Sequence, residues 1–511
     1  MDTSSSIQER PTRHAAVLLV SVFIIAICGL VYELIVGTLS SYLFGNSVVH
    51  FSVTIGLFMS AMGLGAYVSR RITQNLLVWF IGVEMGVGLA GGLSAVLLYA
   101  VFATTAYYHV AMVVLILVIG TLIGMEIPLV TRVMGGWEAL KDTLSNVLAF
   151  DYLGALIASV LFPLVLLPRL GLLNTAFATG LLNVAVVGVV LWTFRDLLPQ
   201  VRRLTSLNTM LALGLIAGMI GANPLTAFFE QKMYVDDIIY TKQTPYQRIV
   251  MTRWGSDVRL FLNGALQFST QDEYRYHEPL VHPAMTHSRS REAVLILGGG
   301  DGLAAREVLK YDDVQRVVLV DLDPDVTHLG QTYPPLLHLN ERALLDPRVE
   351  IVNQDAFTYL AASSEAFGVI LIDLPDPNNE SLGKLYSTAF YTLVRRHLAR
   401  GGVVASQATS PYFARKTYWS IIHTAAASGL KPHPYHLYIP SFGDWGFFLA
   451  AEHNLDPATF TPRVPMRYLN PALFQAAFLF DSDIAEVDAE VNTLDNQIIL
   501  AYYDQGWKRW N

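Results

Sequence analysis

Long apolar runs recur through the first half of the chain. From Ala15 to about residue 225 they are each roughly 20 residues long, the length that a helix needs to cross about 30 Å of hydrocarbon. Seven runs are predicted to be membrane-spanning helices, over residues 15–38, 48–69, 77–102, 107–131, 147–167, 171–194 and 206–222. We therefore expect a transmembrane domain of about seven helices over residues 1–225.

The pattern changes after residue 230, where short apolar segments alternate with helical periodicity and none is long enough to span a bilayer. Four of these segments end in acidic residues: "AVLILGGGD", "VVLVDLD", "VEIVNQD" and "VILIDLPD". Strands that alternate with helices favour a doubly wound sheet, in which ligands bind at the carboxyl ends of the parallel strands. We therefore predict an α/β Rossmann-like domain whose acids converge on one crevice, namely Asp301, Asp321, Asp323, Asp355, Asp373 and Asp376.

Composition supports a membrane protein and excludes several classes. The chain has 511 residues, of which 53% are hydrophobic, which is too apolar for an ordinary soluble protein. Its net charge of -8 disfavours binding to nucleic acid, which needs basic surfaces. Cys28 is the single cysteine, so no disulfide framework or cysteine-based metal site is expected. His277 and His282 are five apart, without the spacing of a helical metal site, and we expect no metal.

Positive charges of the first half fall into alternate loops between the predicted spans. These loops hold Arg10, Arg13, Arg70, Arg71, Arg132, Lys141, Arg195, Arg202 and Arg203, whereas the opposite loops hold only Arg169. By the positive-inside rule the N-terminus lies in the cytoplasm, and seven spans would then place the second half outside.

Four acids lie in or at the edges of the predicted spans: Glu33, Glu84, Glu126 and Asp151. Ionisable groups at membrane depth are costly and commonly mark a ligand or ion path, although acids near helix ends can reach the interface. Glu33 is the best candidate for such a role because it lies in the middle of its segment. Glu126 precedes a proline and is compatible with a structural kink.

An acid stands in the glycine-rich turn "GGGDG", where a pyrophosphate would bind in the ordinary dinucleotide fingerprint. Asp321 has the spacing of the acid that binds ribose hydroxyls, but Asp301 would repel a pyrophosphate. The predicted ligand is therefore a nucleoside with a cationic tail. The alternative for Asp301 is a cap on the helix that begins near Leu303, and Asp355 could be a cap likewise.

Several motifs resemble the spermidine synthases, or polyamine aminopropyltransferases, in order from about Tyr246 to Glu452. These motifs are "LFLNGALQFSTQDEYRYHEPLVHPAM", "LGGGDG", "DLPDP", "LYSTAFY" and "SQATSPY". The resemblance implies transfer of an aminopropyl group from decarboxylated S-adenosylmethionine to an amine, with release of methylthioadenosine and without a further cofactor. It also implies a β-rich substrate-gate segment over residues 226–290 and a catalytic Rossmann-like domain over residues 291–511.

The same resemblance assigns roles to individual residues. Asp301 would attract the ammonium tail of the donor and repel the carboxylate of ordinary S-adenosylmethionine. Asp321 would bind the ribose and Asp355 the adenine, and the remaining donor-binding residues would be Gln267, Gly298, Gly300 and Asp323.

On the acceptor side, Asp373 is the candidate for accepting the proton of the amine. Asp376 and Tyr276 would hold the acceptor through charge and cation–π attraction. His277 would hydrogen-bond the amine, or it could be a structural partner of its own loop. Phe442 stands where family members commonly carry an acceptor-pocket tyrosine. The acceptor therefore stays open between putrescine, agmatine, cadaverine and a longer polyamine.

The first half resembles the membrane portion of fused bacterial spermidine synthases in "ICGLVYELIVGTLSSYLFGNS" and "DYLGALIASVLFPLVLLPRLG". We expect a multi-pass enzyme of the cell (inner) membrane, with a polyamine substrate and the lipid bilayer as partners, assembled as a dimer or larger homo-oligomer. The donor is made in the cytoplasm, so a cytoplasmic catalytic domain is expected against the charge bias.

Two other functions fit parts of the sequence. A polyamine transporter or sensor could carry a non-catalytic nucleoside-binding domain, but it would not need Asp301, Asp373 and Asp376 together. A methyltransferase shares the fold, but Asp301 would face the carboxylate of the methyl donor.

Overall fold

The computed structural model describes residues 5–44, 47–105, 107–135, 140–456 and 460–510. The chain forms two compact units, Met1–Asp236 and Asp237–Asn511. The boundary lies just beyond the end of the expected transmembrane domain. The expected gate segment is divided between the units, because its first part forms a helix of unit 1.

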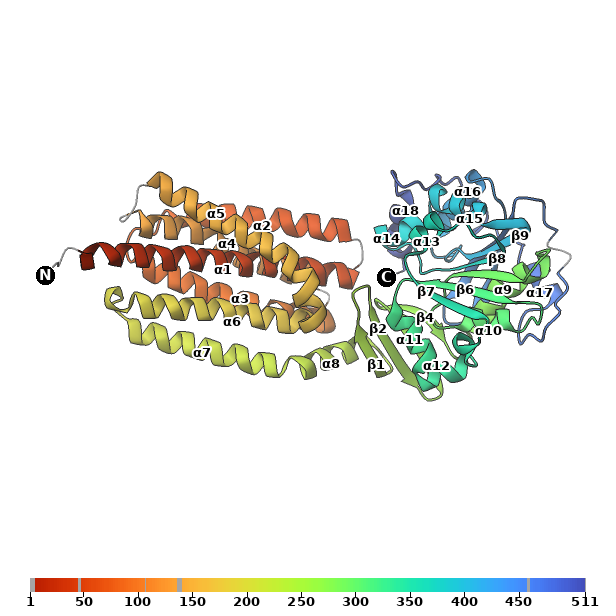
Figure 1. Cartoon of the computed structure of the whole chain (residues 1–511), viewed down its shortest axis with the longest axis horizontal. Helices are drawn as coiled ribbons and strands as arrows, with labels where there is room; N and C mark the ends of the chain where they lie inside the picture. The colour runs from red at the N-terminus through yellow and green to blue at the C-terminus, as the bar shows by residue number, and fades with distance from the viewer. Residues whose placement is uncertain (1–4, 45–46, 106, 136–139, 457–459, 511) are drawn as a thin grey trace. The chain divides into compact units, whose positions relative to one another are not determined.

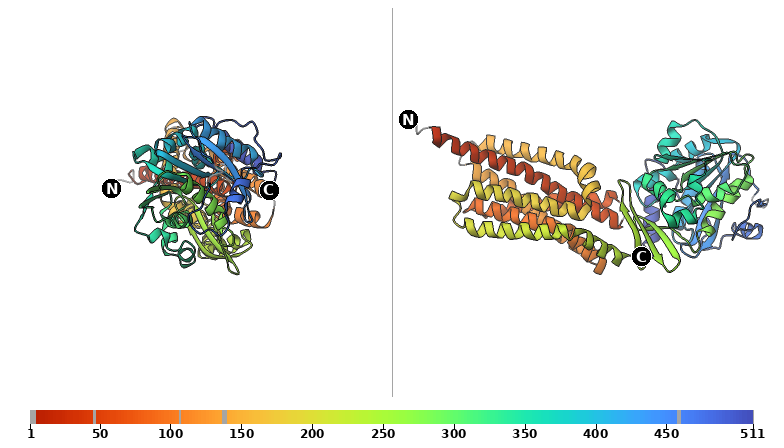
Figure 2. Two further views of the ribbon diagram at one scale, coloured as in Figure 1. Left: turned by 90° about the vertical axis from the view of Figure 1, so that its right-hand side faces the viewer. Right: turned by 60° about the horizontal axis from the view of Figure 1, so that its bottom comes forward.

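Each apolar run of unit 1 forms a helix, and the seven helices of the described part run roughly along one axis (Figures 1 and 2). They are α1 (Ser5–Phe44), α2 (Ser47–Ser69), α3 (Leu76–Thr104), α4 (Tyr108–Met134), α5 (Leu140–Leu161), α6 (Leu167–Thr193) and α7 (Val201–Ile220), followed by α8 (Ala222–Met233). Six helical stretches of the described residues are long and apolar enough to cross a membrane. The longest, Asp142–Thr193, contains α5 from Asp142 onward and all of α6, and it is broken at Gly171, which has a φ of 72°.

The ends of the helices that carry the basic loops lie at one end of the bundle. Arg132 donates to the carbonyl oxygens of Ser69 at 2.9 Å and Ile72 at 2.8 Å, which joins the ends of α4 and α2. The His14 ring lies 4.7 Å from the Phe194 ring, which places the end of α6 beside the N-terminal part of α1. The helix α7 ends at the opposite end of the bundle (Figure 1). The side chains of Arg10, Arg13 and Lys141 lie outside the described residues.

Unit 2 begins with a four-stranded antiparallel sheet in the order β1-β2-β3-β4. Its strands are β1 (Asp237–Gln243), β2 (Arg248–Trp254), β3 (Asp257–Leu262) and β4 (Ala265–Ser269). The helix α9 (Tyr274–His287) follows and leads into the larger sheet. This segment supplies Gln267, Tyr276 and His277.

The larger sheet of unit 2 has seven strands in the order β10-β11-β9-β8-β5-β6-β7. The strands β5 (Ala293–Gly298), β6 (Arg316–Asp321), β7 (Val349–Asn353), β8 (Phe367–Asp373) and β9 (Leu398–Gln407) are parallel. The strands β10 (Lys431–Ile439) and β11 (Gly443–Ala451) complete it as an antiparallel pair. The predicted Rossmann-like domain is confirmed.

The central strands are apolar on both faces because helices cover both. The helices α9 and α10 (Leu303–Leu309) pack on one face, and α13 (Ala356–Ala362), α15 (Thr388–Arg396) and α16 (Arg415–Ala427) pack on the other. Such double burial explains the unbroken apolar runs that the sequence shows at these strands. The chain continues from β5 to β6 on one side and returns to β8 on the other. This reversal places a crevice at the carboxyl ends of β5 and β8.

Further helices precede or follow the parallel strands. They are α11 (Pro324–Thr332), α12 (Pro334–Leu339), α14 (Glu380–Gly383), α17 (Pro471–Ala476) and α18 (Ile498–Trp507). The C-terminal helix α18 packs against α14 and α16, close to the carboxyl ends of the strands.

Candidate active site

The glycine-rich turn after β5 fits tightly against two of the predicted acids. Gly298 is paired with Asp373 in the register of β5 and β8, and a Cβ at Gly298 would overlap the carbonyl oxygen of Asp373. A Cβ at Gly300 would lie 2.6 Å from a carboxylate oxygen of Asp321. The N–H of Gly300 donates to that same oxygen at 3.0 Å. Only glycines allow this approach, which fixes the turn against the second-strand acid Asp321.

Asp321 is held by backbone donors on two sides. Its other oxygen accepts the N–H of Asp323 at 2.9 Å. Burial raises the pKa of Asp321 to about 6, and the two backbone hydrogen bonds oppose that rise. The carboxylate is thus fixed and charged at neutral pH, as binding to ribose hydroxyls requires.

Asp301 bonds to the first residue of α10 and also belongs to the site. One carboxylate oxygen accepts the N–H of Leu303, the first residue of α10, at 2.9 Å. The N-cap residue of α10 is Gly302, so Asp301 satisfies a helix N–H from one position earlier than the capping alternative supposed. The side chain also interacts with the charges of His277 and Asp373. Burial raises the pKa of Asp301 to about 6, the positive charge of His277 opposes the rise, and Asp373 adds to it. The bond to α10 therefore coexists with a position at which the charges of His277 and Asp373 act on Asp301.

Asp373 is the acid at the end of β8 and is partly exposed to the crevice. The hydroxyl of Tyr276 donates to Asp373 Oδ1 at 2.7 Å, so the tyrosine orients the carboxylate. Burial raises the pKa of Asp373, while the charge of His277 and the bond from Tyr276 limit the rise. A carboxylate with a raised pKa is a better proton acceptor than an ordinary one.

His277 is fixed by Glu273, which the sequence motif contains but which received no role. The His277 Nδ1 atom lies 2.8 Å from the Glu273 carbonyl oxygen and 3.0 Å from its carboxylate. Burial alone would lower the pKa of His277, but Glu273, Asp373 and Asp301 raise it to about 9. Arg306 holds the same carboxylate through bonds of 3.0 and 2.8 Å. His277 is therefore a structural partner of the first turn of α9, and its positive charge offsets the repulsion between the neighbouring acids. Its predicted hydrogen bond to the amine stays a prediction.

Asp376 faces a strained residue of the "SQATSPY" segment. The Thr409 hydroxyl donates to Asp376 Oδ2 at 2.7 Å. Thr409 has a φ of 61°, which is costly for a β-branched residue and is typical of functional sites. Gln407 and Gly446 hold it in place, because its N–H donates to Gln407 at 2.9 Å and its carbonyl accepts from Gly446 at 2.8 Å. Burial raises the pKa of Asp376 to about 6 against the hydrogen bond from Thr409.

Tyr503 brings a hydroxyl to Asp376 from the C-terminal helix α18. Burial raises the pKa of Tyr503 well above its usual value, and the neighbouring charge of Asp376 raises it further. Phe442, by contrast, packs its ring 6.0 Å from Tyr276 and 5.0 Å from Trp445 and offers no hydroxyl. Sequence reasoning missed Tyr503 because nothing along the chain ties α18 to the end of β8.

Three predicted donor-binding residues have other observed contacts. Gln267 lies on β4, and its amide donates to the carbonyl oxygen of Ala265 at 3.0 Å. Asp323 is 1% exposed and accepts hydrogen bonds from Thr244, Gln247 and the N–H of Asp325, which tie the small sheet to the large one.

Asp355 caps α13, accepting the N–H of Thr358 at 2.9 Å, and pairs with Lys384 at 2.8 Å. Burial would raise the pKa of Asp355, but the bond from Lys384 holds it below its usual value. The donor contacts predicted for Gln267, Asp323 and Asp355 stay predictions.

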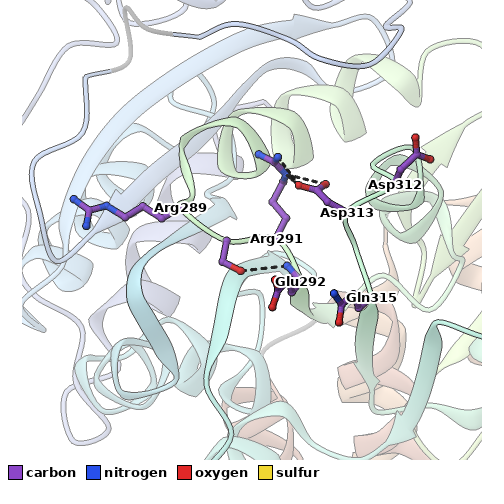
Figure 3. Close-up of a pocket in the computed structure, with 7 residues that line it drawn as sticks. Arg289, Arg291, Glu292, Asp312, Asp313 and Gln315 are labelled. Carbon is purple, nitrogen blue, oxygen red and sulfur yellow. Dashed lines mark hydrogen bonds and ion pairs between the residues drawn. The ribbon is translucent and has the colours of Figure 1, made fainter.

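A separate pocket lies at the opposite edge of the sheet, before β5 and β6 (Figure 3). Its volume is about 290 Å³, and it is lined by Arg289, Ser290, Arg291, Glu292, Asp312, Asp313 and Gln315. Arg291 pairs with Asp313 at 2.6 Å across it. The predicted acids lie at the other ends of these strands, so this pocket is not the candidate site. In the described ranges no three His, Cys, Asp or Glu residues form a group that could hold a metal.

The fold and the site together define a Rossmann-like domain with an acid-lined crevice for a nucleoside carrying a positive charge. The family profile described as "Spermine/spermidine synthase domain" matches residues 273–461, from the start of α9 to beyond β11. The profile therefore spans the turn acids, Asp373 and Asp376.

Curated relatives match nearly the whole chain, including unit 1. A "Polyamine aminopropyltransferase 2" of Ralstonia nicotianae is 47% identical, covering 97% of this chain and 99% of the relative. A "Polyamine aminopropyltransferase" of Leptospira interrogans is 44% identical, covering 96% and 99%. One of Mycobacterium tuberculosis is 41% identical, covering 98% of each chain. The chain belongs to the polyamine aminopropyltransferases, the spermidine synthase family. It is an aminopropyltransferase, and its co-substrate is decarboxylated S-adenosylmethionine.

Two solved structures are also similar in part. A spermidine synthase in complex with the transition-state analogue AdoDATO is 27% identical, with a TM-score of 0.44, covering 48% of this chain and 86% of that one. The spermidine synthase from Thermotoga maritima is 26% identical, with a TM-score of 0.43, covering 48% and 85%.

Proposed function

We propose that the chain is a membrane-bound enzyme that transfers the aminopropyl group to a diamine of the putrescine type, giving spermidine or a close relative. The observation that carries this proposal is the convergence of Asp301, Asp373 and Asp376 with Tyr276 at the crevice beyond β5 and β8. A nucleoside-binding module without turnover would not require an oriented carboxylate of raised pKa beside a second acid.

The donor binds along the ends of β5 and β6 in this proposal. Asp321, fixed by Gly300, holds the ribose hydroxyls. Asp301 uses one oxygen for its helix and directs the charge of its carboxylate to the ammonium tail of the donor. The carboxylate of ordinary S-adenosylmethionine would lie beside Asp301 and Asp373 and would be repelled. The local charge thus selects the decarboxylated donor.

Transfer is a single displacement at the carbon next to the sulfonium. The amine nitrogen attacks that carbon, a C–N bond forms, and the C–S bond breaks with its electron pair going to sulfur. Methylthioadenosine leaves as a neutral thioether. A free alkylamine has a pKa of about 10, so it must give up a proton, which Asp373 accepts. Base catalysis of this kind contributes about 10²–10⁴-fold, and alignment of the reacting atoms contributes further.

The distal end of the acceptor lies between Asp376, Tyr276 and Tyr503. Asp376 pairs with the second ammonium group, and Thr409 orients its carboxylate. The ring of Tyr276 adds cation–π attraction. The hydroxyl of Tyr503 supplies the polar contact that Phe442 lacks. A short diamine satisfies both carboxylates at once, which favours a diamine over a monoamine.

The test is incubation of the full chain with decarboxylated S-adenosylmethionine and a panel of amines: putrescine, cadaverine, agmatine, spermidine and a monoamine. Release of methylthioadenosine should be fastest with a diamine. Fastest release with agmatine or spermidine would overturn the diamine assignment. Donor binding without release for any amine would support the transporter or sensor alternative and overturn the enzyme.

Membrane attachment rests on unit 1, whose helices match the length and hydropathy of membrane spans. We place unit 2 on the cytoplasmic side because its donor is made there. The positive-inside rule argues for the opposite side, because it places the basic end of the bundle in the cytoplasm and seven spans then lead the chain out of it. Arg132 weakens that argument in part, since its guanidinium is engaged by the end of α2. A reporter fused after Asn511 tests on which side of the membrane unit 2 lies. Activity of a periplasm-specific reporter would overturn the cytoplasmic placement.

A further inference from the structure

Buried polar side chains from four helices meet inside unit 1. Glu84 on α3 is 1% exposed, Glu126 on α4 is 2% exposed, and Asn183 on α6 and Tyr32 on α1 are fully buried. The amide of Asn183 donates to Glu84 Oε2 at 3.1 Å. Glu33, the acid preferred from the sequence, is only half buried. By burial, Glu84 and Glu126 are therefore better candidates for an internal site than Glu33.

Close contacts between the helices place Glu84, Glu126 and Asn183 at neighbouring levels of the bundle, which we call the layer, and place Tyr32 further along α3. A Cβ at Gly88 would lie 3.3 Å from the Cβ of Asn183, and a Cβ at Gly91 would overlap the ring of Tyr32. A Cβ at Gly86 would lie 3.2 Å from Leu122, one turn before Glu126 on α4. The glycines of α3 thus let α4 and α6 approach within about one turn of Glu84, and let α1 approach about two turns beyond it.

The layer lies well inside the bundle. Glu84 is eight residues after the start of α3, and Glu126 is eight residues before the end of α4. At 1.5 Å per residue both lie about 12 Å from the basic end of the bundle. That depth is near the middle of a hydrocarbon slab about 30 Å thick, where charged groups mark ion or ligand sites.

The free hydrogen-bonding atoms of this layer and of Tyr32 are mostly acceptors. In the part of the chain that the structure describes, Glu84 Oε1, Glu126 Oε1, Asn183 Oδ1 and the Tyr32 hydroxyl have no partner. Buried polar atoms of native proteins are normally paired, and exceptions commonly mark an ion or water. Three of the four atoms can only accept when the carboxyls are ionised. The missing partner must therefore donate protons or carry a positive charge.

Other titratable groups near the layer do not supply that charge. Cys28 and Tyr32 of α1 and Asp151 of α5 interact electrostatically with Glu84 or Glu126. None of the described groups that act on these two carboxyls is basic. The neighbours are neutral or acidic, so they increase the need for a cation.

We propose that Glu84, Glu126 and Asn183 bind one small monovalent cation, a proton or a sodium ion, inside the bundle. Their oxygen atoms suit a hard cation or a shared proton. The proposal does not rest on the aminopropyl transfer, because none of these residues belongs to unit 2.

The test measures thermal unfolding of the full chain in detergent, as wild type, Glu84→Gln, Glu126→Gln and the control Glu33→Gln. At constant ionic strength the unfolding temperature of the wild type and of Glu33→Gln should rise when choline chloride is replaced by sodium chloride, or when the pH is lowered. A sodium effect identifies the ion, and a pH effect without one identifies the proton. Either effect should be lost in Glu84→Gln and reduced in Glu126→Gln.

Infrared spectra of the wild type provide a second readout if the glutamine variants do not fold. A protonated buried carboxyl has a carbonyl band that should be present in the proton case and should disappear with sodium in the sodium case. The absence of both a sodium response and a protonated-carboxyl band would overturn the proposal. Equal loss of the response in Glu33→Gln, or stabilisation by putrescine alone, would overturn it too.

Discussion

Unit 1 and unit 2 both bury acidic side chains, but they treat them differently. In unit 2, Asp321 and Asp301 accept backbone N–H groups, and Asp373 and Asp376 accept hydroxyls. In unit 1, Glu84 accepts one amide hydrogen from Asn183. Glu84 Oε1 and Glu126 Oε1 have no partner among the described residues, and the same holds for Asp376 Oδ1 in unit 2. Donors orient a carboxylate, and an unpaired buried oxygen leaves room for a cation. At Asp376 that cation is the ammonium group of the proposed acceptor, and at Glu84 and Glu126 it is the proposed small cation. Burial alone does not define a site; the partners of the buried group do.

Removal of the proton acceptor should have the largest effect. Asp373→Asn keeps the shape of the side chain and its contact with Tyr276 but cannot take a proton. We expect kcat to fall by about 10²–10⁴-fold, with little change in the dissociation constant of the donor measured by calorimetry. Asp312→Asn, at an exposed position, is the matched control. An unchanged kcat in Asp373→Asn would remove this residue from the proton transfer.

Acidification should inactivate the enzyme by neutralising the oriented acids. The pKa values of Asp301, Asp321 and Asp376 are each raised to about 6 by burial, so all three are charged above that pH. As the pH falls through about 6 they gain protons and lose their attraction for ammonium groups. We expect kcat/KM for both substrates to fall by about tenfold or more per pH unit below this value. If kcat/KM stayed constant as the pH fell to the usual pKa range of aspartates, the raised pKa values would be contradicted.

The charge of Asp301 should control the choice of donor. The side-chain oxygen of asparagine can accept the N–H of Leu303 as that of aspartate does, so Asp301→Asn should fold normally. Loss of a charge-assisted hydrogen bond of about 1.5–3 kcal/mol should raise KM for the decarboxylated donor roughly 10- to 100-fold. Inhibition by ordinary S-adenosylmethionine should strengthen at the same time. Unchanged discrimination between the two compounds would show that Asp301 only bonds to the start of α10.

Removal of the Tyr503 hydroxyl should have the smallest effect, and this effect should be confined to binding of the acceptor amine. Tyr503→Phe removes a contact of about 0.5–1.5 kcal/mol, which corresponds to a roughly 2- to 10-fold rise in KM for the amine. KM for the donor should not change. Tyr502→Phe is the control on the same helix, since Tyr502 faces Glu490 and Lys416 instead. Equal effects of the two variants would point to the stability of α18 rather than to the acceptor site.

The periodicity of the sequence predicted the elements of both units and the place of the crevice. Asp321, Asp301 and Asp373 could be predicted because parallel strands bring their carboxyl ends together. Thr409 and Tyr503 could not, because a strained φ and a helix that folds back from the C-terminus leave no local pattern. Glu84 and Glu126 were not preferred over Glu33 because helices that are apolar all round do not reveal their buried face.

The most direct test of the account compares two donors with the same acceptor. The full chain is incubated with putrescine and either decarboxylated or ordinary S-adenosylmethionine, and methylthioadenosine is measured over time. The account predicts steady release with the decarboxylated donor and none above background with the ordinary one. Absence of release with both donors, or equal release with both, would contradict it.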